Sequence, residues 1–221
     1  MLLIVRVVVA VVPMVWIMRQ VRKPSGWLGG RLVRSMNLSH AKLTDWGLEQ
    51  VSVPSNASIL DIGCGGGRTV QRLATIANQG TIVGLDYSAA SVAASRETNA
   101  QEIKSGRVEI QEGSVVSLPF ADATFDLVTG VETHYYWPNL PASIREVRRV
   151  LKPGGRIALI AETYRGGPYR LLYGMIMPLI GAAFLSDEEH RRLLIDAGFA
   201  EVETKHRPRT NWILATGRKP A

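Results

Sequence analysis

Cysteine is almost absent from this chain, which has Cys64 as its single thiol among 221 residues. One cysteine cannot form an intramolecular disulfide, and it cannot supply the paired thiolates of a structural zinc site. We therefore expect no disulfide framework and no metal site. The chain is compatible with a reducing compartment.

Acidic residues are missing from the first 44 positions, which carry seven basic residues: Arg6, Arg19, Arg22, Lys23, Arg31, Arg34 and Lys42. The remaining 177 residues have 19 basic and 19 acidic side chains and are formally neutral. A nucleic-acid enzyme usually carries a basic stripe on its main domain. Because the excess positive charge lies at one end, we expect no nucleic-acid partner and favour an anionic membrane surface.

The longest apolar run also lies at this end, where Arg6 is the only charged residue between positions 2 and 18. A helix of that length rises about 26 Å, the lower limit for a bilayer core. Basic residues follow, so residues 1–23 predict a membrane anchor that leaves the bulk of the chain in the cytoplasm, at the inner face of the membrane. Arg6 and Pro13 weaken that prediction. The run could instead be a buried strand or helix, or an upstream extension whose true start is Met14 or Met18.

Beyond residue 24 the chain alternates between short apolar runs and amphipathic stretches. The predicted strands cover residues 58–63, 81–86, 107–113, 125–130, 155–162, 201–206 and 211–217, and the helices cover 66–80, 89–104, 143–151 and 186–199. Pro153, Gly154 and Gly155 are expected to close the third of these helices. The pattern predicts an α/β fold with a doubly wound, mostly parallel seven-stranded sheet and a C-terminal antiparallel hairpin. Residues 24–54 would form a helical cap, and residues 55–221 the main domain.

The stretch ILDIGCGGG joins the first strand to the first helix, where doubly wound folds bind nucleotides. Its glycines Gly63, Gly65 and Gly67 would let a ligand approach the backbone. A dinucleotide fingerprint would need glycine in place of Arg68, and no Gly-Lys-Ser/Thr phosphate loop is present. Asp61 at the strand tip would repel a pyrophosphate and attract an amine. The loop therefore favours a nucleoside whose tail is not a phosphate.

An acidic residue ends the second strand as well: Asp86 follows Asp61 by 25 positions. A carboxylate at this tip can accept hydrogen bonds from both hydroxyl groups of a ribose. A lone aspartate here would more often be a helix cap or turn residue. Its pairing with the glycine loop at this spacing favours ribose binding.

Four motifs in order resemble those of class I S-adenosylmethionine-dependent methyltransferases of the type 11 group, which includes enzymes of ubiquinone and menaquinone biosynthesis. They are ILDIGCGGG, VGLDYS, EGSVVSLPFADATFDLV and REVRRVLKPGGRIAL, and they lie within residues 55–162. The resemblance implies a Rossmann-like enzyme that transfers a methyl group from S-adenosyl-L-methionine to a small-molecule acceptor. It also implies that the cofactor contacts Asp61, Gly63, Gly65, Gly67, Asp86, Tyr87, Ser114 and Val115.

In that pattern Asp61 would lie near the cofactor's ammonium group, Asp86 at the ribose and Tyr87 at the adenine edge. Ser114 stands where the family often has an aspartate that accepts from the adenine amino group. That contact is therefore weaker here, or passes to a backbone carbonyl or to Glu112.

Methyl transfer needs a base only when the acceptor atom arrives protonated. The stretch GVETHYYWPNL follows the fourth strand, whose carboxyl end faces the expected ligand crevice. His134 is the catalytic candidate there because an unperturbed histidine has a pKa of ~6.5. His40 is a second candidate. Alternatively, the aromatic run packs beneath the cofactor and His134 binds a backbone carbonyl.

An apolar insertion at residues 165–185 interrupts the alternation after the fifth strand. Glycine and proline break it, and its uncharged part is too short to span a membrane. Its Met, Leu and Ile content predicts a lid or substrate wall for an apolar acceptor such as a lipid, quinone or terpenoid. A core helix that covers a sheet face is the alternative.

Two other functions stay open. An NAD- or nucleotide-sugar-dependent Rossmann enzyme would share the fold, although Asp61 and Arg68 count against it. A catalytically degenerate cofactor-binding scaffold would explain departures such as Ser114.

Overall fold

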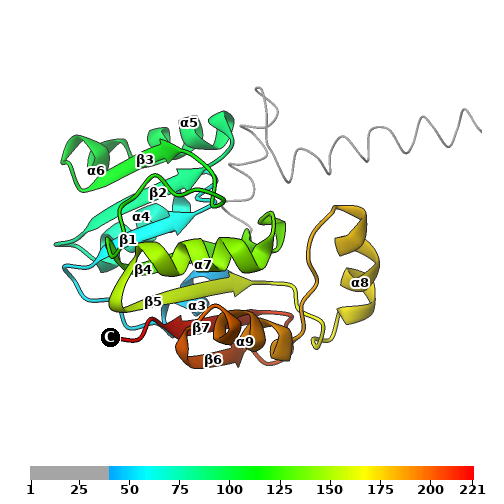
Figure 1. Ribbon diagram of the computed structural model, residues 1–221. Helices are drawn as coiled ribbons and strands as arrows, with labels where there is room; N and C mark the ends of the chain where they lie inside the picture. Colours follow the sequence, from blue (N-terminus) through cyan, green and yellow to red (C-terminus); the bar gives the residue numbers. More distant parts are fainter. Residues whose placement is uncertain (1–39) are drawn as a thin grey trace, which may run out of the picture.

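The computed structural model describes residues 40–221, which form one seven-stranded sheet in the order β3-β2-β1-β4-β5-β7-β6 (Figure 1). Strands β1 to β5 are parallel, and β7 runs antiparallel to both β5 and β6. The strands are β1 Ser58–Ile62, β2 Thr81–Asp86, β3 Val108–Glu112, β4 Phe125–Val131, β5 Leu151–Ala161, β6 Ala200–His206 and β7 Ile213–Arg218. The predicted doubly wound, mostly parallel sheet with a C-terminal hairpin is confirmed.

Helices cover both faces of the sheet because successive strand residues point to opposite sides. In β1, Ile59 belongs to the apolar core on one face and Leu60 to the core on the other. Contacts place α3, α4 and α5 with strands β1, β2, β3 and β5, and α7 and α9 with β5, β6 and β7. The helices are α3 Ala41–Leu48, α4 Arg68–Ile76, α5 Ala89–Thr98, α6 Ala100–Lys104, α7 Leu140–Val150, α8 Arg170–Leu179 and α9 Asp187–Asp196.

Two predicted boundaries are wrong. The helix expected over 89–104 is divided at Asn99, whose side-chain amide donates to the carbonyls of Gly67 and Ser95 at 3.0 and 2.9 Å. Pro153, Gly154 and Gly155 were expected to close a helix but lie inside β5, which pairs with β4 from Leu151 onward. In both places a long-range contact overrides the local preference of the chain.

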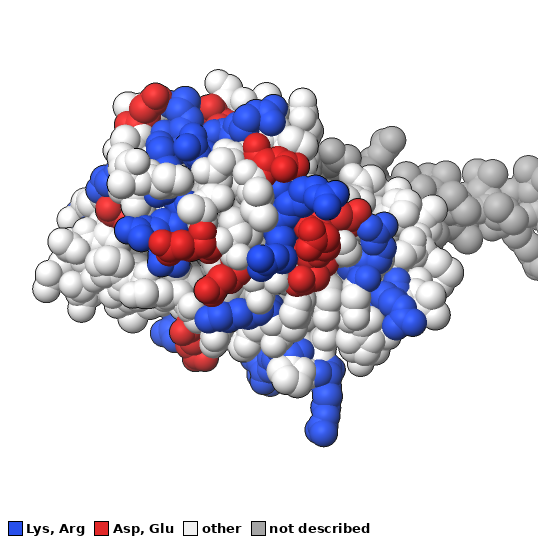
Figure 2. Space-filling model, turned by 60° about the horizontal axis from the view of Figure 1, so that its bottom comes forward, with Lys and Arg blue, Asp and Glu red and all other residues white. Residues whose placement is uncertain are grey.

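The N-terminal predictions fall mostly outside the described residues. The membrane anchor over residues 1–23 and the alternative starts lie there, and α3 is the described part of the expected cap. None of the helices among residues 40–221 is long and apolar enough to cross a bilayer. Figure 2 shows Lys and Arg interspersed with Asp and Glu in small groups, in keeping with the formal charge of only +1 on residues 40–221.

The insertion at 165–185 contains α8, which stands beside the carboxyl edge of the sheet, apart from the two helix layers (Figure 1). Asn211, at the end of the β6–β7 loop, holds its start, because the side-chain oxygen accepts the Tyr169 N–H at 2.9 Å. Met177 is its one fully buried residue, while Leu171, Met175 and Leu179 are exposed. The helix therefore presents apolar side chains to both sides.

Two buried histidines connect the end of β4 to α9. The Nε2 atoms of His134, in the short 3₁₀ helix η1 (His134–Tyr136), and His190 lie 3.1 Å apart. His190 Nδ1 lies 2.8 Å from the Ser186 carbonyl, so this nitrogen carries the hydrogen. His190 Nε2 is then the acceptor, His134 Nε2 is the donor, and His134 Nδ1 is left without a partner. This arrangement requires both rings to be neutral.

The histidine pair predicts a pH-dependent stability. Burial lowers the pKa of both rings, and that of His134 falls well below 6.5. As the pH falls below about 6.5, the histidines of the unfolded chain bind protons, whereas the folded pair stays neutral. The free energy of unfolding therefore drops by up to about 1.4 kcal/mol per pH unit for each ring. In His134→Gln, urea unfolding between about pH 7.5 and about pH 5.5 should show a shallower decline.

His190→Gln should behave similarly, since the two rings share one contact. Carboxyl groups titrate alike in wild type and variants, so their contribution cancels in the comparison. A constant difference between wild type and His134→Gln at every pH would contradict the neutral pair.

Candidate active site

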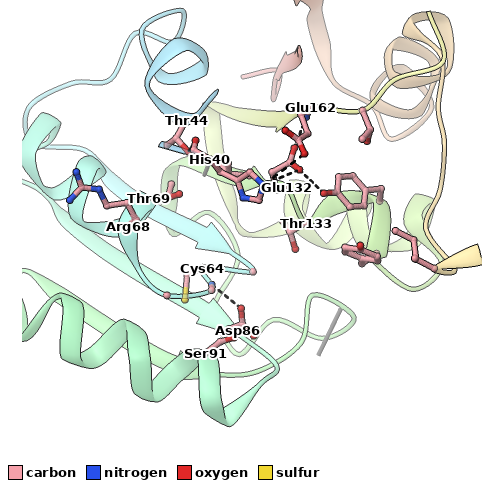
Figure 3. Close-up of a pocket in the computed structure, with 18 of the residues that line it drawn as sticks. His40, Thr44, Cys64, Arg68, Thr69, Asp86, Ser91, Glu132, Thr133 and Glu162 are labelled. Atoms are coloured by element: carbon pink, nitrogen blue, oxygen red, sulfur yellow. Dashed lines mark hydrogen bonds and ion pairs between the residues drawn. The ribbon is translucent and has the colours of Figure 1, made fainter. Parts of the chain in front are cut away.

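A cavity of about 260 Å³ opens at the carboxyl ends of β1, β2 and β4 (Figure 3). The glycine loop after β1 and the tip of β2 form one side, and the residues that follow β4 and β5 form the other. A second cavity of about 90 Å³ adjoins it. The two cavities share five lining residues: Gly63, Asp86, Tyr87, Thr133 and Tyr136.

The glycine loop has two different uses for its missing side chains. Gly63, Gly65 and Gly67 all have left-handed φ angles, of 73°, 52° and 82°. A Cβ on Gly65 would face open space, whereas one on Gly63 would come within 2.1 Å of the Thr133 hydroxyl. The missing side chain of Gly65 therefore keeps the cavity open, and that of Gly63 lets the loop contact Thr133 after β4.

Gly67 lines neither cavity. A Cβ at this position would come within 2.4 Å of both the Ser95 hydroxyl and the Asn99 amide. It serves the packing of the loop against α5, and the structure does not bring it to the expected ligand position.

Asp86 joins the loop to the start of α5. One carboxylate oxygen accepts the Gly65 N–H and the other accepts the Ser88 N–H, both at 2.9 Å. Burial raises the pKa of this carboxyl, while these hydrogen bonds lower it. Asp86 and Tyr87 line both cavities, as expected of residues that contact a nucleoside.

Asp61 is buried behind the loop and lines neither cavity. Its carboxylate accepts a hydrogen bond of 2.7 Å from the Thr129 hydroxyl. Burial raises the pKa of Asp61 to about 7. Contact with a ligand amine would therefore have to pass through the loop or through water.

The smaller cavity has the character of a base-binding slot. Ser114 and Val115 line it, together with Ile62, Leu85, Gly113 and Trp137. The Ser114 hydroxyl accepts the Val116 N–H at 3.3 Å. Arg68 and Thr69 open α4 beside the larger cavity, where a carboxylate would meet a helix N-terminus, while the Arg68 guanidinium points away and donates to Gln71 at 2.7 Å (Figure 3). The two cavities thus offer an apolar slot for a flat base, the Asp86 carboxylate for a ribose and the start of α4 for an amino-acid tail. This arrangement fits S-adenosylmethionine.

Two glutamates and a histidine form the far wall of the larger cavity. Glu132 follows β4, Glu162 follows β5 and His40 precedes α3. His40 Nε2 lies 4.0 Å from the Glu132 carboxylate and 3.9 Å from that of Glu162 (Figure 3). Burial lowers the pKa of His40 and raises that of Glu132 to about 8, to which the Glu162 charge contributes.

Glu132 lies in the stretch GVETHYYWPNL that was expected at the crevice, and His40 was expected as a second base candidate, but Glu162 and the grouping of the three were not predicted. The signal was present, since β4 and β5 are neighbours in the sheet and each is followed by a glutamate. The three ligand-type atoms lie within 4.8 Å of one another, a spacing at which a metal ion could bind. However, both Glu132 oxygens already accept hydrogen bonds, from the Glu162 N–H and from Tyr135. We therefore interpret the group as an acid–base cluster.

His134 is not brought to this site. It lines neither cavity, and its ring points into the core toward His190. The neighbouring Thr133, Tyr135 and Tyr136 do line the larger cavity. Opposite the glycine loop, the insertion adds Tyr173, Ile176, Met177 and Ile180 to the lining.

Comparisons with known proteins agree with this geometry. A family model described as a methyltransferase domain matches residues 60–159. The demethylmenaquinone methyltransferase of Lactiplantibacillus plantarum is 31% identical over 143 residues, which are 62% of this chain and 60% of that protein. The enzyme of the same name from Shouchella clausii is 31% identical over 159 residues, 69% of this chain and 67% of its own length.

Among solved structures, human N-acetylserotonin methyltransferase in complex with S-adenosylmethionine matches with a TM-score of 0.72 and 17% identity. The match covers 87% of this chain and 56% of the human chain, and it shows a shared fold. The family model goes further, because residues 60–159 include the glycine loop and the strands β2 and β4, and the two bacterial relatives are methyltransferases at 31% identity. The chain therefore belongs to the class I family of S-adenosylmethionine-dependent methyltransferases.

Proposed function

We propose that this protein transfers a methyl group from S-adenosylmethionine to a small, largely apolar acceptor. The observation that carries the proposal is the cavity of about 260 Å³ that joins the glycine loop and Asp86 to the inner side of α8. The cofactor would supply an activated methyl group on a sulfonium, so that displacement on carbon needs little covalent help. The protein's share is then to align the acceptor and to exclude water.

The residues on the glycine-loop side of the two cavities support a cofactor-binding role for that side. Asp86 and Tyr87 would hold the ribose and adenine, with Ser114 and Val115 along the smaller cavity. Gly63 and Gly65 would lie against the ribose and methionine parts. An NAD-dependent reaction is disfavoured, because Arg68 stands where the dinucleotide fingerprint requires its third glycine.

The acceptor side is mainly apolar and aromatic. Ile176 and Met177 of α8 line the larger cavity together with Tyr135 and Tyr136, and this lining suits a ring or an alkyl chain. The names of the bacterial relatives refer to demethylmenaquinone, an acceptor of that character. We therefore propose a quinone-like, lipid or terpenoid acceptor, with α8 as the wall that covers it.

Gly65 offers a sharp test of cofactor binding. Gly65→Val should abolish affinity for S-adenosylhomocysteine, measured by titration calorimetry, and should abolish transfer of tritiated methyl groups into a lipid extract. The reason is that a side chain at this position would project into open cavity space. The folded state should survive, at a cost of about 1 kcal/mol or more for the left-handed conformation.

Gly106→Val is the matched control. Gly106 also has a left-handed φ, of 77°, with nothing within 4 Å of its hypothetical Cβ, but it lines neither cavity. This variant should lose similar stability and keep its affinity. Retained binding in Gly65→Val, or equal loss in both variants, would show that the ligand does not lie against this loop.

We further propose that residues 1–23 attach the enzyme to the inner face of a membrane, because the apolar run at positions 2–18 is followed directly by basic residues. Deletion of residues 1–23 should move the protein from the membrane to the soluble fraction and leave its affinity for S-adenosylhomocysteine unchanged. Mass spectrometry of the full-length product must confirm its first residues. A product that begins at Met1 and fractionates wholly with soluble protein would refute the anchor.

A further inference from the structure

Glu132 is held in an unusual way for a residue at the end of a strand. Its φ is +57°, in the left-handed region, and its neighbours in β4 are regular. A non-glycine residue in this region costs of order 1 kcal/mol and persists where surrounding contacts enforce it. The contact that fixes the position is on the backbone, where the Glu132 N–H donates to the Ile160 carbonyl of β5 at 2.9 Å.

The side chain is fixed as firmly as the backbone. One carboxylate oxygen accepts the backbone N–H of Glu162 at 2.5 Å, and the other accepts the Tyr135 hydroxyl at 2.8 Å. The side chain is 7% exposed, and what remains exposed borders the cavity. The carboxylate is thus held in one position in the wall of the cavity that the glycine loop and α8 also line.

Four titratable groups face this carboxylate from the elements around it. They are His40 before α3, Tyr135 in η1, Glu162 after β5 and Tyr173 in α8. Burial, with the charges of Glu162 and Glu132, raises the pKa of Tyr173 to about 12, and burial lowers that of His40. None of the four is therefore a cation at neutral pH, and Glu132 lacks the positive partner that a buried carboxylate needs.

We propose that Glu132 is the general base of the reaction and that it takes its proton from a hydroxyl group of the acceptor. The inference rests on the proposed methyl transfer and names its substrate class: a neutral alcohol or phenol. His40 and Glu162 are positioning residues that close the cavity wall beside the base.

The step balances as follows. The acceptor O–H bond breaks, its proton goes to the Glu132 carboxylate, and the oxygen keeps the electron pair. That pair forms the new bond to the methyl carbon, while the electrons of the carbon–sulfur bond stay on sulfur. The products are a methyl ether, S-adenosylhomocysteine and a neutral Glu132, which returns its proton to water.

The positive partner missing from the wall would come with the cofactor. Burial raises the pKa of Glu132 to about 8, so this carboxyl is mainly protonated at pH 7 in the free protein. A sulfonium charge in the same cavity favours the ionised carboxylate. S-adenosylhomocysteine has the same amine, carboxylate and nucleoside but no sulfonium. Glu132 is therefore expected to lose its proton when the methyl donor binds and to keep it when the product binds.

Proton release on binding tests this without measuring activity. S-adenosylmethionine and S-adenosylhomocysteine are titrated into the full chain at pH 7, in two buffers of different ionisation enthalpy. The methyl donor should release more protons than the product, by up to about one per site, as expected for one group that is mainly protonated beforehand. Glu132→Gln should abolish this difference, and Glu188→Gln, on the exposed start of α9, should preserve it.

Asp61→Asn tests whether the released proton comes from Asp61, the other buried carboxyl near the loop, whose pKa is about 7. It should leave the difference between the two ligands intact, because both carry the amine that Asp61 would sense. An equal proton count for the two ligands in the wild type would overturn the proposal, as would loss of the difference in Asp61→Asn alone. Failure of both ligands to bind would instead refute the proposed function.

A second titration tests the hydroxyl preference, with 1-naphthol and naphthalene as probes on the S-adenosylhomocysteine complex. Replacement of Glu132 by leucine should reduce the affinity for 1-naphthol relative to naphthalene by about fivefold, the effect of one hydrogen bond to a carboxyl group that is mainly neutral in this complex. An unchanged ratio of the two affinities in Glu132→Leu would show that Glu132 does not contact the hydroxyl group.

Discussion

The site depends on one carboxylate that is shared between two turns. Asp86 accepts the Gly65 N–H with one oxygen and the Ser88 N–H with the other, so the glycine loop after β1 and the cap of α5 are fixed to the tip of β2. The Ser88 hydroxyl adds a cap to α5 by accepting the Ser91 N–H at 3.3 Å. The Asn99 side-chain amide also donates to the Gly67 carbonyl, and Gly67 packs tightly against α5 because it has no side chain. The loop is therefore set before any ligand arrives, and a ribose has to compete with or add to bonds that already exist.

The opposite wall obeys a different constraint. Parallel strands bring their carboxyl ends to one edge, and β4 and β5 each place a glutamate there. The strands also fix the distance between the two walls, since a Cβ on Gly63 would touch Thr133 next to Glu132. Burial without a cation then favours the protonated form of Glu132. The same sheet that positions the cofactor thus sets the ionisation of the proposed base.

Local sequence was enough to predict the parts of the site that lie within one strand and its following loop. Gly63, Gly65, Asp86 and Tyr87 line the cavity because each follows directly from a strand end. His134 could not be placed in this way. Only Thr133 separates it from Glu132, and the turn into η1 directs its ring toward His190, a residue 56 positions away. The need for glycine at position 67 likewise depends on α5, and the break at Asn99 depends on the loop. The local sequence pattern around these residues does not show such long-range contacts.

The most direct test of this account is the affinity of Asp86→Asn for S-adenosylhomocysteine, measured by calorimetry beside wild type and Asp196→Asn. The amide retains one acceptor oxygen but loses the charge, so the affinity should fall by about 1.5–3 kcal/mol, or roughly 10- to 150-fold, while Asp196→Asn, an exposed change on α9, keeps the wild-type value. Wild-type protein should bind S-adenosylhomocysteine and not NAD. Unchanged affinity in a folded Asp86→Asn, or preferential binding of NAD, would contradict the central claim that Asp86 and the glycine loop form a methyltransferase cofactor site.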